Sequence, residues 1–189
     1  TPIPTADFSF VDVCTNDSTF FTDLSVGLPD TYFWNFGDGF TDNTNDPNPE
    51  HVFTTAGTYN VTLTAGYALS GCTNSITQSV TAFPRTVPNF STNTPCLGGA
   101  TNFTDLTTGV PNLWQWDFGD ASPVDVTQNP IHVYALPGIY PIQLITENAF
   151  GCVDTLNSTV EVFPLPVADF TSTVVCLNTM TAFTDISTS

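Results

Sequence analysis

The sequence predicts an all-β protein made of tandem sandwich domains, and three observations support this fold class. Short segments that alternate apolar and polar residues are separated by clusters of Gly, Pro, Asn and Asp, which is typical of β-sandwiches. No segment shows the periodicity of an amphipathic helix. The sequence also repeats itself at a spacing of about 80 residues, a period at which each repeat forms one structural unit.

The opening of the repeat occurs three times. Ala-Asp-Phe at residues 6–8 recurs at 168–170, and Pro-Asn-Phe at 88–90 opens a copy between them. In each copy a cysteine is followed seven residues later by Phe-Thr-Asp, beginning at Phe21, Phe103 and Phe183.

The later part of the repeat occurs twice. Trp-x-Phe-Gly-Asp stands at residues 34–38 and again at 116–120. We therefore expect one sandwich at residues 1–85, a second at 86–165, and the opening strands of a third, truncated repeat at 166–189.

The aromatic strand of each repeat defines a predicted core face. Side chains two residues apart in a strand point the same way, so the face that carries the tryptophan is expected to be buried. Phe33 and Leu113 lie on the opposite face and are expected to be more exposed. The predicted core comprises Tyr32, Trp34, Phe36, Tyr59, Val61 and Leu63 with their second-repeat partners, Trp114, Trp116 and Phe118 among them.

Two positions of the second repeat depart from this pattern. Glycine supplies the positive φ that a tight turn needs, but Ala121 stands where the first repeat has Gly39, so this turn is expected to differ in detail. Pro141 lies inside a predicted strand, where its missing donor predicts a bulge or a late strand start.

The charge of the chain excludes several classes of partner. There are 18 acidic residues and a single basic residue, Arg85, which gives a net charge of −17. Nucleic acid and anionic membrane surfaces are excluded as partners, because binding to either depends on Lys and Arg contacts. No apolar run is long enough for direct membrane insertion. Thr, Ser and Asn are expected to cover the surface instead.

Three linked motifs carry a resemblance to a known family. Tyr-x-Trp-x-Phe-Gly-Asp-Gly, Asn-Pro-x-His-x-Phe and Gly-x-Tyr-x-Val-x-Leu follow one another in the first repeat. The sequence resembles the polycystic kidney disease (PKD) domain, a seven-stranded, antiparallel, immunoglobulin-like β-sandwich common on cell surfaces. The added frame of Cys, Phe-Thr-Asp and Gly-Cys resembles the variant found in large bacterial surface proteins, including gliding-motility adhesins exported by type IX secretion.

The five cysteines predict a disulfide framework. Cys14 with Cys72, and Cys96 with Cys152, occupy equivalent places in the two complete repeats, so we expect these two intradomain disulfides. Cys176 then remains unpaired, with its partner expected beyond Ser189. Each bridge would stabilise its domain by about 4 kcal/mol. Buried free thiols in a reducing compartment are an alternative, and metal ligation is another, although neither a Cys-x-x-Cys pair nor a nearby His supports it.

Candidate chemistry is sparse. His51 and His132 occupy the same repeat position, which favours a structural role, and no nucleophile elbow, zinc-protease or phosphate-loop motif is present. We therefore expect no catalysis and no bound cofactor other than calcium. Calcium requires hard oxygen ligands, although loop Asp residues also form turns and caps. The candidate ligands are Asp38, Asp42, Asp46, Asp120 and Asp125.

Glycan contacts and glycosylation are further hypotheses. Glycan binding favours exposed aromatic residues, but Trp114 aligns with Tyr32 as a core residue. Phe20 and Phe33 point outward from strands expected in opposite sheets. Asp-Ser-Thr and Asp-Thr-Leu resemble a bacterial O-glycosylation acceptor pattern, with candidate acceptors Ser18 and Thr155.

The resemblance implies a non-catalytic stalk or filament segment of an extracellular bacterial repeat adhesin, with prolines stiffening the joints. The alternative is a set of accessory PKD modules of a secreted polysaccharide- or protein-degrading enzyme. Expected partners are neighbouring repeats and an extracellular surface, glycan or protein. The third repeat presents Phe170 and Phe183 without an opposing sheet, so residues 168–189 are expected to be disordered if the chain ends at Ser189.

Overall fold

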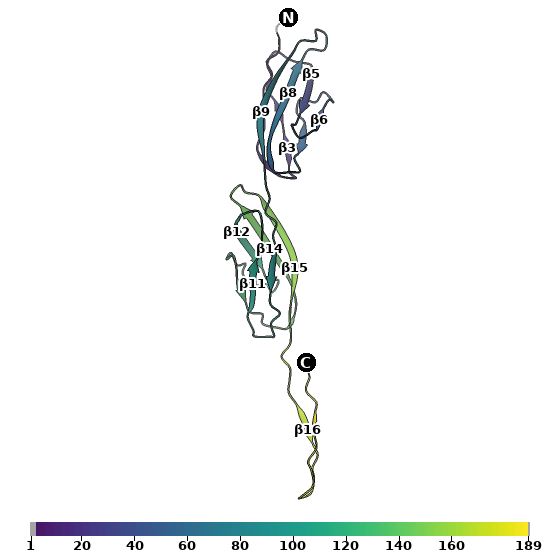
Figure 1. Ribbon diagram of the computed structural model, residues 1–189, viewed down its shortest axis with the longest axis vertical. Coiled ribbons are helices and arrows are strands. Elements are labelled where there is room, and N and C mark those ends of the chain that lie inside the picture. Colours follow the sequence, from purple (N-terminus) through teal and green to yellow (C-terminus); the bar gives the residue numbers. More distant parts are fainter. Residues whose placement is uncertain (1–2, 189) are drawn as a thin grey trace. The chain divides into compact units, whose positions relative to one another are not determined.

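The computed structural model describes residues 3–188, which form β-strands and no helix (Figure 1). Within these residues there is accordingly no helix able to cross a bilayer. Contacts divide the chain into two compact units. The first comprises Thr1–Thr86 with Asn148–Cys152, and the second comprises Val87–Glu147 with Val153–Ser189.

The first unit is built around a five-stranded sheet with the order β2-β9-β8-β5-β6. Its centre is the long antiparallel hairpin of β8 and β9, whose register runs from Gly57 opposite Ala82 to Gly66 opposite Thr73. β2 joins β9 in parallel, so this sandwich is not wholly antiparallel. These strands are β2 (Val13–Cys14), β5 (Thr31–Asn35), β6 (Thr41–Asp42), β8 (Gly57–Gly66) and β9 (Thr73–Phe83).

Two short strand pairs complete the first unit, β1 with β4 and β3 with β7. Residues 10–12 lie outside the sheet and separate β1 from β2. Phe21 likewise separates β3 from β4, so each of these two extended stretches is divided into two strands. The four strands are β1 (Phe8–Ser9), β3 (Ser18–Phe20), β4 (Thr22–Asp23) and β7 (Glu50–Val52).

The second unit repeats this plan with two three-stranded sheets, β10-β11-β13 and β12-β14-β15. Again a long antiparallel hairpin, β14 with β15, forms the centre. The strands are β10 (Phe90–Thr92), β11 (Thr101–Asp105), β12 (Pro111–Asp117), β13 (Ile131–His132), β14 (Gly138–Asn148) and β15 (Val153–Val162). Both units are therefore β-sandwiches of the predicted class.

The predicted core face is confirmed in both units. Trp34 and Trp116 are fully buried, and each donates its indole N–H to a backbone carbonyl 3.0 Å away. Phe33 and Leu113 are exposed, as expected. The outermost aromatic positions are only half-buried at the edge of the core, because hydroxyl or indole groups there reach polar partners: Tyr32, Tyr59, Trp114 and Tyr140.

The predicted irregularity at Pro141 is wrong. β14 runs through Pro141 with an unbroken register, and Pro141 lies opposite Thr159. A Cβ placed on Gly119 would come within 2.1 Å of the Pro141 carbonyl oxygen and 2.7 Å of its Cδ. The nitrogen and carbonyl of Pro141 therefore face the Gly119 turn, beyond the end of β12, and no ladder bond to β15 is lost.

The turn after the aromatic strand also differs less than expected between the units. Gly37 and Gly119 have φ values of 80° and 71°. Ala121 adopts a φ of 64°, the same sign as Gly39 at 99°, so both turns use left-handed residues at equivalent places. The alanine accepts this conformation at an energetic cost, because its Cβ is crowded there.

A third hairpin follows, formed by β16 (Phe170–Ser172) and β17 (Phe183–Asp185). Its register places Phe170 opposite Asp185, as Phe8 lies opposite Asp23 and Phe90 opposite Asp105. The segment therefore has the local structure of a repeat opening. Residues 168–188 thus form a hairpin and not the disordered stretch expected there, although Phe170 and Phe183 are 61% and 68% exposed because no sheet opposes them.

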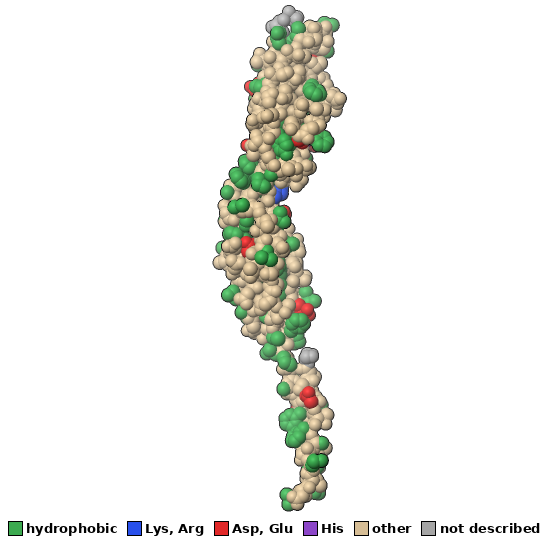
Figure 2. Space-filling view, viewed as in Figure 1, with side chains coloured by type: hydrophobic (Ala, Val, Ile, Leu, Met, Phe, Trp, Pro, Cys, Tyr) green, Lys and Arg blue, Asp and Glu red, His purple; other side chains and the backbone are tan. Residues whose placement is uncertain are grey.

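The surface is mainly neutral. Figure 2 shows backbone and uncharged polar side chains over most of the visible face, with carboxylates scattered among them. Cross-strand hydroxyl pairs contribute to this surface, such as Thr62 with Thr77 and Thr64 with Ser75, each 2.8 Å apart.

Candidate functional site

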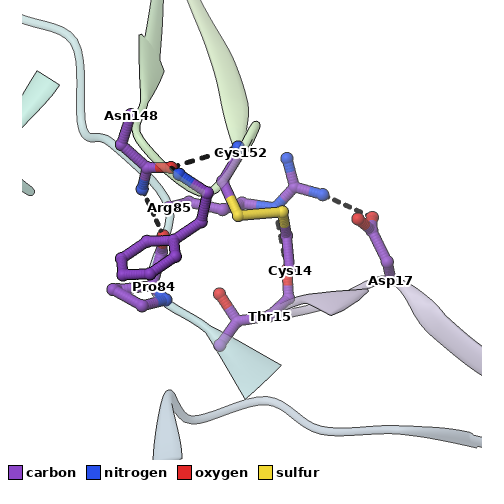
Figure 3. Close-up of a disulfide and its surroundings, with 8 residues drawn as sticks. Cys14, Thr15, Asp17, Pro84, Arg85, Asn148 and Cys152 are labelled. Atoms are coloured by element: carbon purple, nitrogen blue, oxygen red, sulfur yellow. Dashed lines mark hydrogen bonds and ion pairs between the residues drawn. A yellow bond between two sulfur atoms is a disulfide. The ribbon is translucent and has the colours of Figure 1, made fainter. Parts of the chain in front are cut away.

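A disulfide in the first unit joins Cys14 to Cys152, and it is the most distinctive chemical feature of the chain (Figure 3). The Cα atoms are 5.7 Å apart, which is ordinary disulfide geometry, and the two residues are separated by 138 positions in sequence. Cys14 lies on β2, and Cys152 closes the turn between β14 and β15.

This bridge corrects the predicted pairing of Cys14 with Cys72. Cys14 lies beside Phe83, the last residue of β9, whereas Cys72 immediately precedes the first residue of β9. Eleven residues of extended strand separate the two positions by about 36 Å. A disulfide requires Cα atoms within about 7 Å, so the two cysteines of one repeat cannot pair.

The predicted pairing of Cys96 with Cys152 fails for the same reason. Cys96 forms a parallel bridge with Phe163, just past the end of β15, while Cys152 immediately precedes β15. The distance along the strand is again about 36 Å. Cys72, Cys96 and Cys176 are free thiols in the structure.

Asn148 fixes the turn that carries Cys152. The side chain is 4% exposed, and its amide donates to the Pro84 carbonyl at 2.7 Å. Its carbonyl oxygen accepts hydrogen bonds from the N–H groups of Phe150 at 3.0 Å and Cys152 at 3.1 Å. One buried amide therefore satisfies the turn internally and also holds it against the end of β9, as Figure 3 shows.

Two further contacts surround the bridge. The ring of Phe150 stacks on that of Phe83, with centroids 4.4 Å apart and planes 9° from parallel. Arg85, the single basic residue, donates from Nε to the Thr15 carbonyl at 2.8 Å and pairs with Asp17. The one Lys or Arg side chain of the sequence therefore lies beside the disulfide.

The environment of the bridge suits a permanent link better than an exchangeable one. Cys152 is fully buried, and exchange requires that an attacking thiolate reach a disulfide sulfur. Although the Arg85 guanidinium lies nearby, Cys152 is fully buried, unlike the accessible cysteines of catalytic sites. The arrangement covalently joins two parts of the chain that are 138 positions apart in sequence.

Each repeat also contains a half-buried histidine–aspartate pair. His51 Nε2 lies 2.7 Å from Asp38 Oδ2, and His132 Nε2 lies 2.7 Å from Asp120 Oδ2. Each imidazole stacks on the phenylalanine of the aromatic strand, with centroids 4.1 Å and 4.2 Å apart. The repetition of the whole cluster supports the structural role predicted for both histidines.

These pairs set the protonation of the two carboxylates. Burial acts to raise the pKa of Asp38, but hydrogen bonds from His51 and the Phe40 N–H, with the charge of the imidazole, hold it below its usual value. At Asp120 burial again acts upward, and hydrogen bonds from Ser122 and His132 lower the pKa. Both carboxylates are therefore kept ionised by neighbours that are already in place.

The structure does not gather the candidate calcium ligands. Besides the two paired with histidine, Asp42, Asp46 and Asp125 each cap a nearby turn by accepting a backbone N–H two residues on, at 2.7 to 2.8 Å. Among residues 3–188 no group of three or more His, Cys, Asp or Glu side chains is arranged to hold a metal ion. In the structure, these aspartates form turns and caps, which is the alternative to calcium binding that the sequence left open.

The candidate glycosylation acceptors differ in access. Thr155 is exposed on β15, whereas Ser18 is half-buried on β3. Of the outward aromatics, Phe20 lies on β3, while Phe33 lies on β5 in the other sheet, so they do not share one platform.

Sequence reasoning missed a groove in the second unit. Its volume is about 390 Å³, and Trp114 forms part of its wall. The Trp114 indole donates to Asp105 Oδ2 at 2.9 Å, and the Gln128 amide donates to the same oxygen at 3.0 Å. The alignment with Tyr32 correctly placed Trp114 near the core, but it could not show that Asp105 and Gln128 would leave its edge in an open groove.

Comparison with solved structures gives distant similarities. The fold is similar to the PKD1 domain of Vibrio anguillarum Epp, at 21% identity and a TM-score of 0.40 over 43% of this chain and 96% of that one. Fibronectin(III)-like modules of Clostridium thermocellum CbhA match at 12% identity and 0.38, over 86% and 95%. Three N-terminal domains of bacteriophage RB49 Hoc match at 13% and 0.41, over 97% and 69%.

The sequence match is more decisive than these distant folds. The family described as PKD domain matches residues 2–83 and again residues 94–163, which together are most of the chain. The two matches contain the two sandwiches with their equivalent tryptophans and histidine–aspartate pairs. The chain therefore belongs to the PKD domain family, with the domain present in tandem.

Proposed function

We propose that this chain is a non-catalytic stalk segment of an extracellular bacterial repeat adhesin, which spaces and presents a binding region. The observation that carries the proposal is the disulfide that closes 138 positions of a tandem PKD chain. A single domain can be stapled by a bridge within one sheet pair. A bridge from β2 to the turn after β14 instead encloses most of both matched segments in one covalent loop of sequence.

The bridge has a direct mechanical consequence. When the two ends of the chain are pulled, tension passes through the Cys14–Cys152 bond and not through the residues between them. Those residues remain folded or slack until the covalent bond is reduced. A segment that carries load between a surface and a ligand would keep nearly the same length under tension, because the bridged residues cannot be pulled out by unfolding.

The proposed location follows from the same chemistry. Disulfides persist in oxidising compartments such as the cell surface and are rare in the cytosol. The acidic, lysine-free composition gives a net charge of −17, which favours solubility at an exposed surface.

Single-molecule pulling from the two termini tests the proposal. Without reductant, the fully extended chain should be shorter by about 480 Å than with reductant, at about 3.5 Å for each of 138 enclosed positions. Cys14→Ser should give the long form under both conditions, and Cys176→Ser is the matched control that should behave like the unmodified chain. Equal lengths in both redox states would remove the basis of the proposal.

A second candidate function is supported by the groove beside Trp114. The groove is lined by the Trp114 ring, the Glu147 carboxylate and the Gln128 amide, a combination suited to sugar hydroxyls, as expected for an accessory module of a secreted polysaccharide-degrading enzyme. Depletion of the chain from solution by insoluble polysaccharides, abolished in Gln128→Ala, would favour this candidate. No depletion on a panel of polysaccharides would favour the stalk.

A further inference from the structure

Half of the disulfide site is repeated at Cys96. Cys14 lies opposite Phe83 in a parallel bridge, and the next residue donates its N–H to the Phe83 carbonyl at 2.9 Å. Cys96 lies opposite Phe163 in the same parallel sense, and Leu97 donates to the Phe163 carbonyl at 2.8 Å. The backbone that aims the Cys14 thiol is thus rebuilt at Cys96, which is exposed and unpaired.

The other half of the site is repeated at Cys72. In the turn that carries Cys152, Asn148 donates its N–H to the Cys152 carbonyl at 3.2 Å, and Gly151 has a φ of 78°. In the turn that carries Cys72, Tyr67 donates to the Cys72 carbonyl at 3.0 Å, and Gly71 has a φ of 67°. Both cysteines therefore follow a left-handed glycine at the tip of a long hairpin.

The two free halves are of opposite kinds. One strand-held cysteine and one turn-held cysteine have already joined as Cys14–Cys152. What remains is one of each, Cys96 and Cys72, and both are free thiols in this structure. In the existing disulfide, a cysteine on a strand is bonded to a cysteine in a hairpin turn. We therefore expect each free cysteine to pair with a cysteine of the other kind.

We propose that Cys96 forms a disulfide with the turn-held cysteine of a PKD repeat in another molecule, and that a second copy of this chain supplies it through Cys72. The two thiols together lose two protons and two electrons. A small-molecule disulfide accepts them and is reduced to two thiols. Repetition of this step joins copies head to tail, with Cys72 of one copy bound to Cys96 of the next.

The apolar contact beside the bridge has a counterpart in this pairing. Phe163 follows β15 as Phe83 ends β9, and it is half-exposed. Leu69 lies fully exposed at the tip of the Cys72 turn, where Phe150 lies in the other turn. A Leu69–Phe163 contact would take the place of the Phe83–Phe150 stack.

One contact is not reproduced. Tyr67 stands at the place of Asn148, and its hydroxyl bonds to the Gly27 carbonyl, so it makes no equivalent of the amide bond to Pro84. The new link should therefore form more slowly than Cys14–Cys152, and it should need an added oxidant. Like Cys14–Cys152, it should join a cysteine on a strand to a cysteine in a turn and not two cysteines of the same kind.

The experiment uses the full chain carrying Cys176→Ser, which removes the third free thiol, incubated with oxidised glutathione. We expect a ladder of covalent oligomers on non-reducing gels, and peptide mapping should find Cys72 linked to Cys96. Adding Cys72→Ser should leave monomers, and adding Cys96→Ser should do the same. A mixture of these two variants should form dimers and stop there, because each supplies one half.

Several outcomes would overturn the proposal. They are disulfide-linked dimers in either single variant alone, Cys72–Cys72 or Cys96–Cys96 peptides as abundant as the mixed one, or monomers only in the parent. Tryptophan fluorescence confirms that each variant is folded, since Trp34 and Trp116 are fully buried. Peptide mapping of the same samples also shows whether Cys14–Cys152 is present. The stalk proposal rests on that bond, so its outcome is read independently of the Cys72–Cys96 result.

Discussion

The two sandwiches have nearly the same interior but differ at the tips of their long hairpins. Trp34 and Trp116 occupy equivalent, fully buried places, each with a carbonyl partner for its indole. By contrast, the turn of the second hairpin has a buried Asn148 and a bonded Cys152, whereas the first has Tyr67 and a free Cys72. Packing fixes the interior of each repeat independently, while the two hairpin tips differ in sequence and in the contacts they make.

The largest expected effect tests whether the interiors are equivalent. Trp34→Ala and Trp116→Ala should each lower the free energy of unfolding of their own sandwich by about 3 to 5 kcal/mol, because each opens a large cavity. Urea unfolding of the oxidised chain, followed by circular dichroism, measures both losses. Phe33→Ala is the control, since this side chain is exposed and should cost much less. A loss below about 1 kcal/mol at either tryptophan would contradict the core assignment.

An intermediate effect concerns the histidine–aspartate pairs. Asp38→Asn and Asp120→Asn should each lower the free energy of unfolding at pH 7 by about 1 to 3 kcal/mol, because a charged, largely buried acceptor is lost. Asp42→Asn is the matched control, since asparagine can still accept the Thr44 N–H.

The same pairs predict a pH dependence. The folded pKa of Asp38 and of Asp120 lies below the unfolded value of about 4, so their contribution is complete above that pH and is lost as pH falls through the folded pKa. Stability should therefore fall on acidification below about pH 4. The two asparagine variants should fall less steeply than the parent, and parallel curves would contradict the assignment.

The comparison of repeats also shows what the sequence could and could not predict. Period-two alternation is a local signal, so it was sufficient to identify the buried face around Trp34 and Trp116. The cysteine pairing was not local. Equivalence between repeats identifies two kinds of cysteine but allows partners within one repeat or in different ones. The deciding fact is that Cys14 lies beside the far end of β9, which only the parallel pairing of β2 reveals.

The other errors have the same origin. Pro141 was expected to disrupt its strand because its missing donor was assumed to face a neighbouring strand. It instead faces the Gly119 turn, where no ladder bond is needed. The Trp114 indole at the groove is bound by Asp105, which also accepts from Gln128, and these residues come from separate parts of the chain. Local patterns thus predicted the faces of strands, while the contacts between distant segments required the structure.

The smallest expected effect concerns the one turn position at which the repeats exchange glycine for alanine. Ala121 has a φ of 64°, and Gly39 has a φ of 99° at the equivalent place. An alanine in the left-handed region costs about 1 to 2 kcal/mol, and glycine recovers part of this because it has no Cβ but loses more entropy on folding. Ala121→Gly should therefore raise the free energy of unfolding of the second sandwich by about 0.5 to 1 kcal/mol.

The reciprocal change, Gly39→Ala, separates backbone strain from crowding. A Cβ at Gly39 would meet no atom within 4 Å, so any loss must come from the dihedral alone. It should destabilise the first sandwich by about 1 kcal/mol, opposite in sign to the change at Ala121. Thermal unfolding of both variants beside the parent measures the pair. If Ala121→Gly were neutral while Gly39→Ala was costly, the second turn would have adapted to its alanine, and the two repeats would differ at this position in more than the identity of one residue.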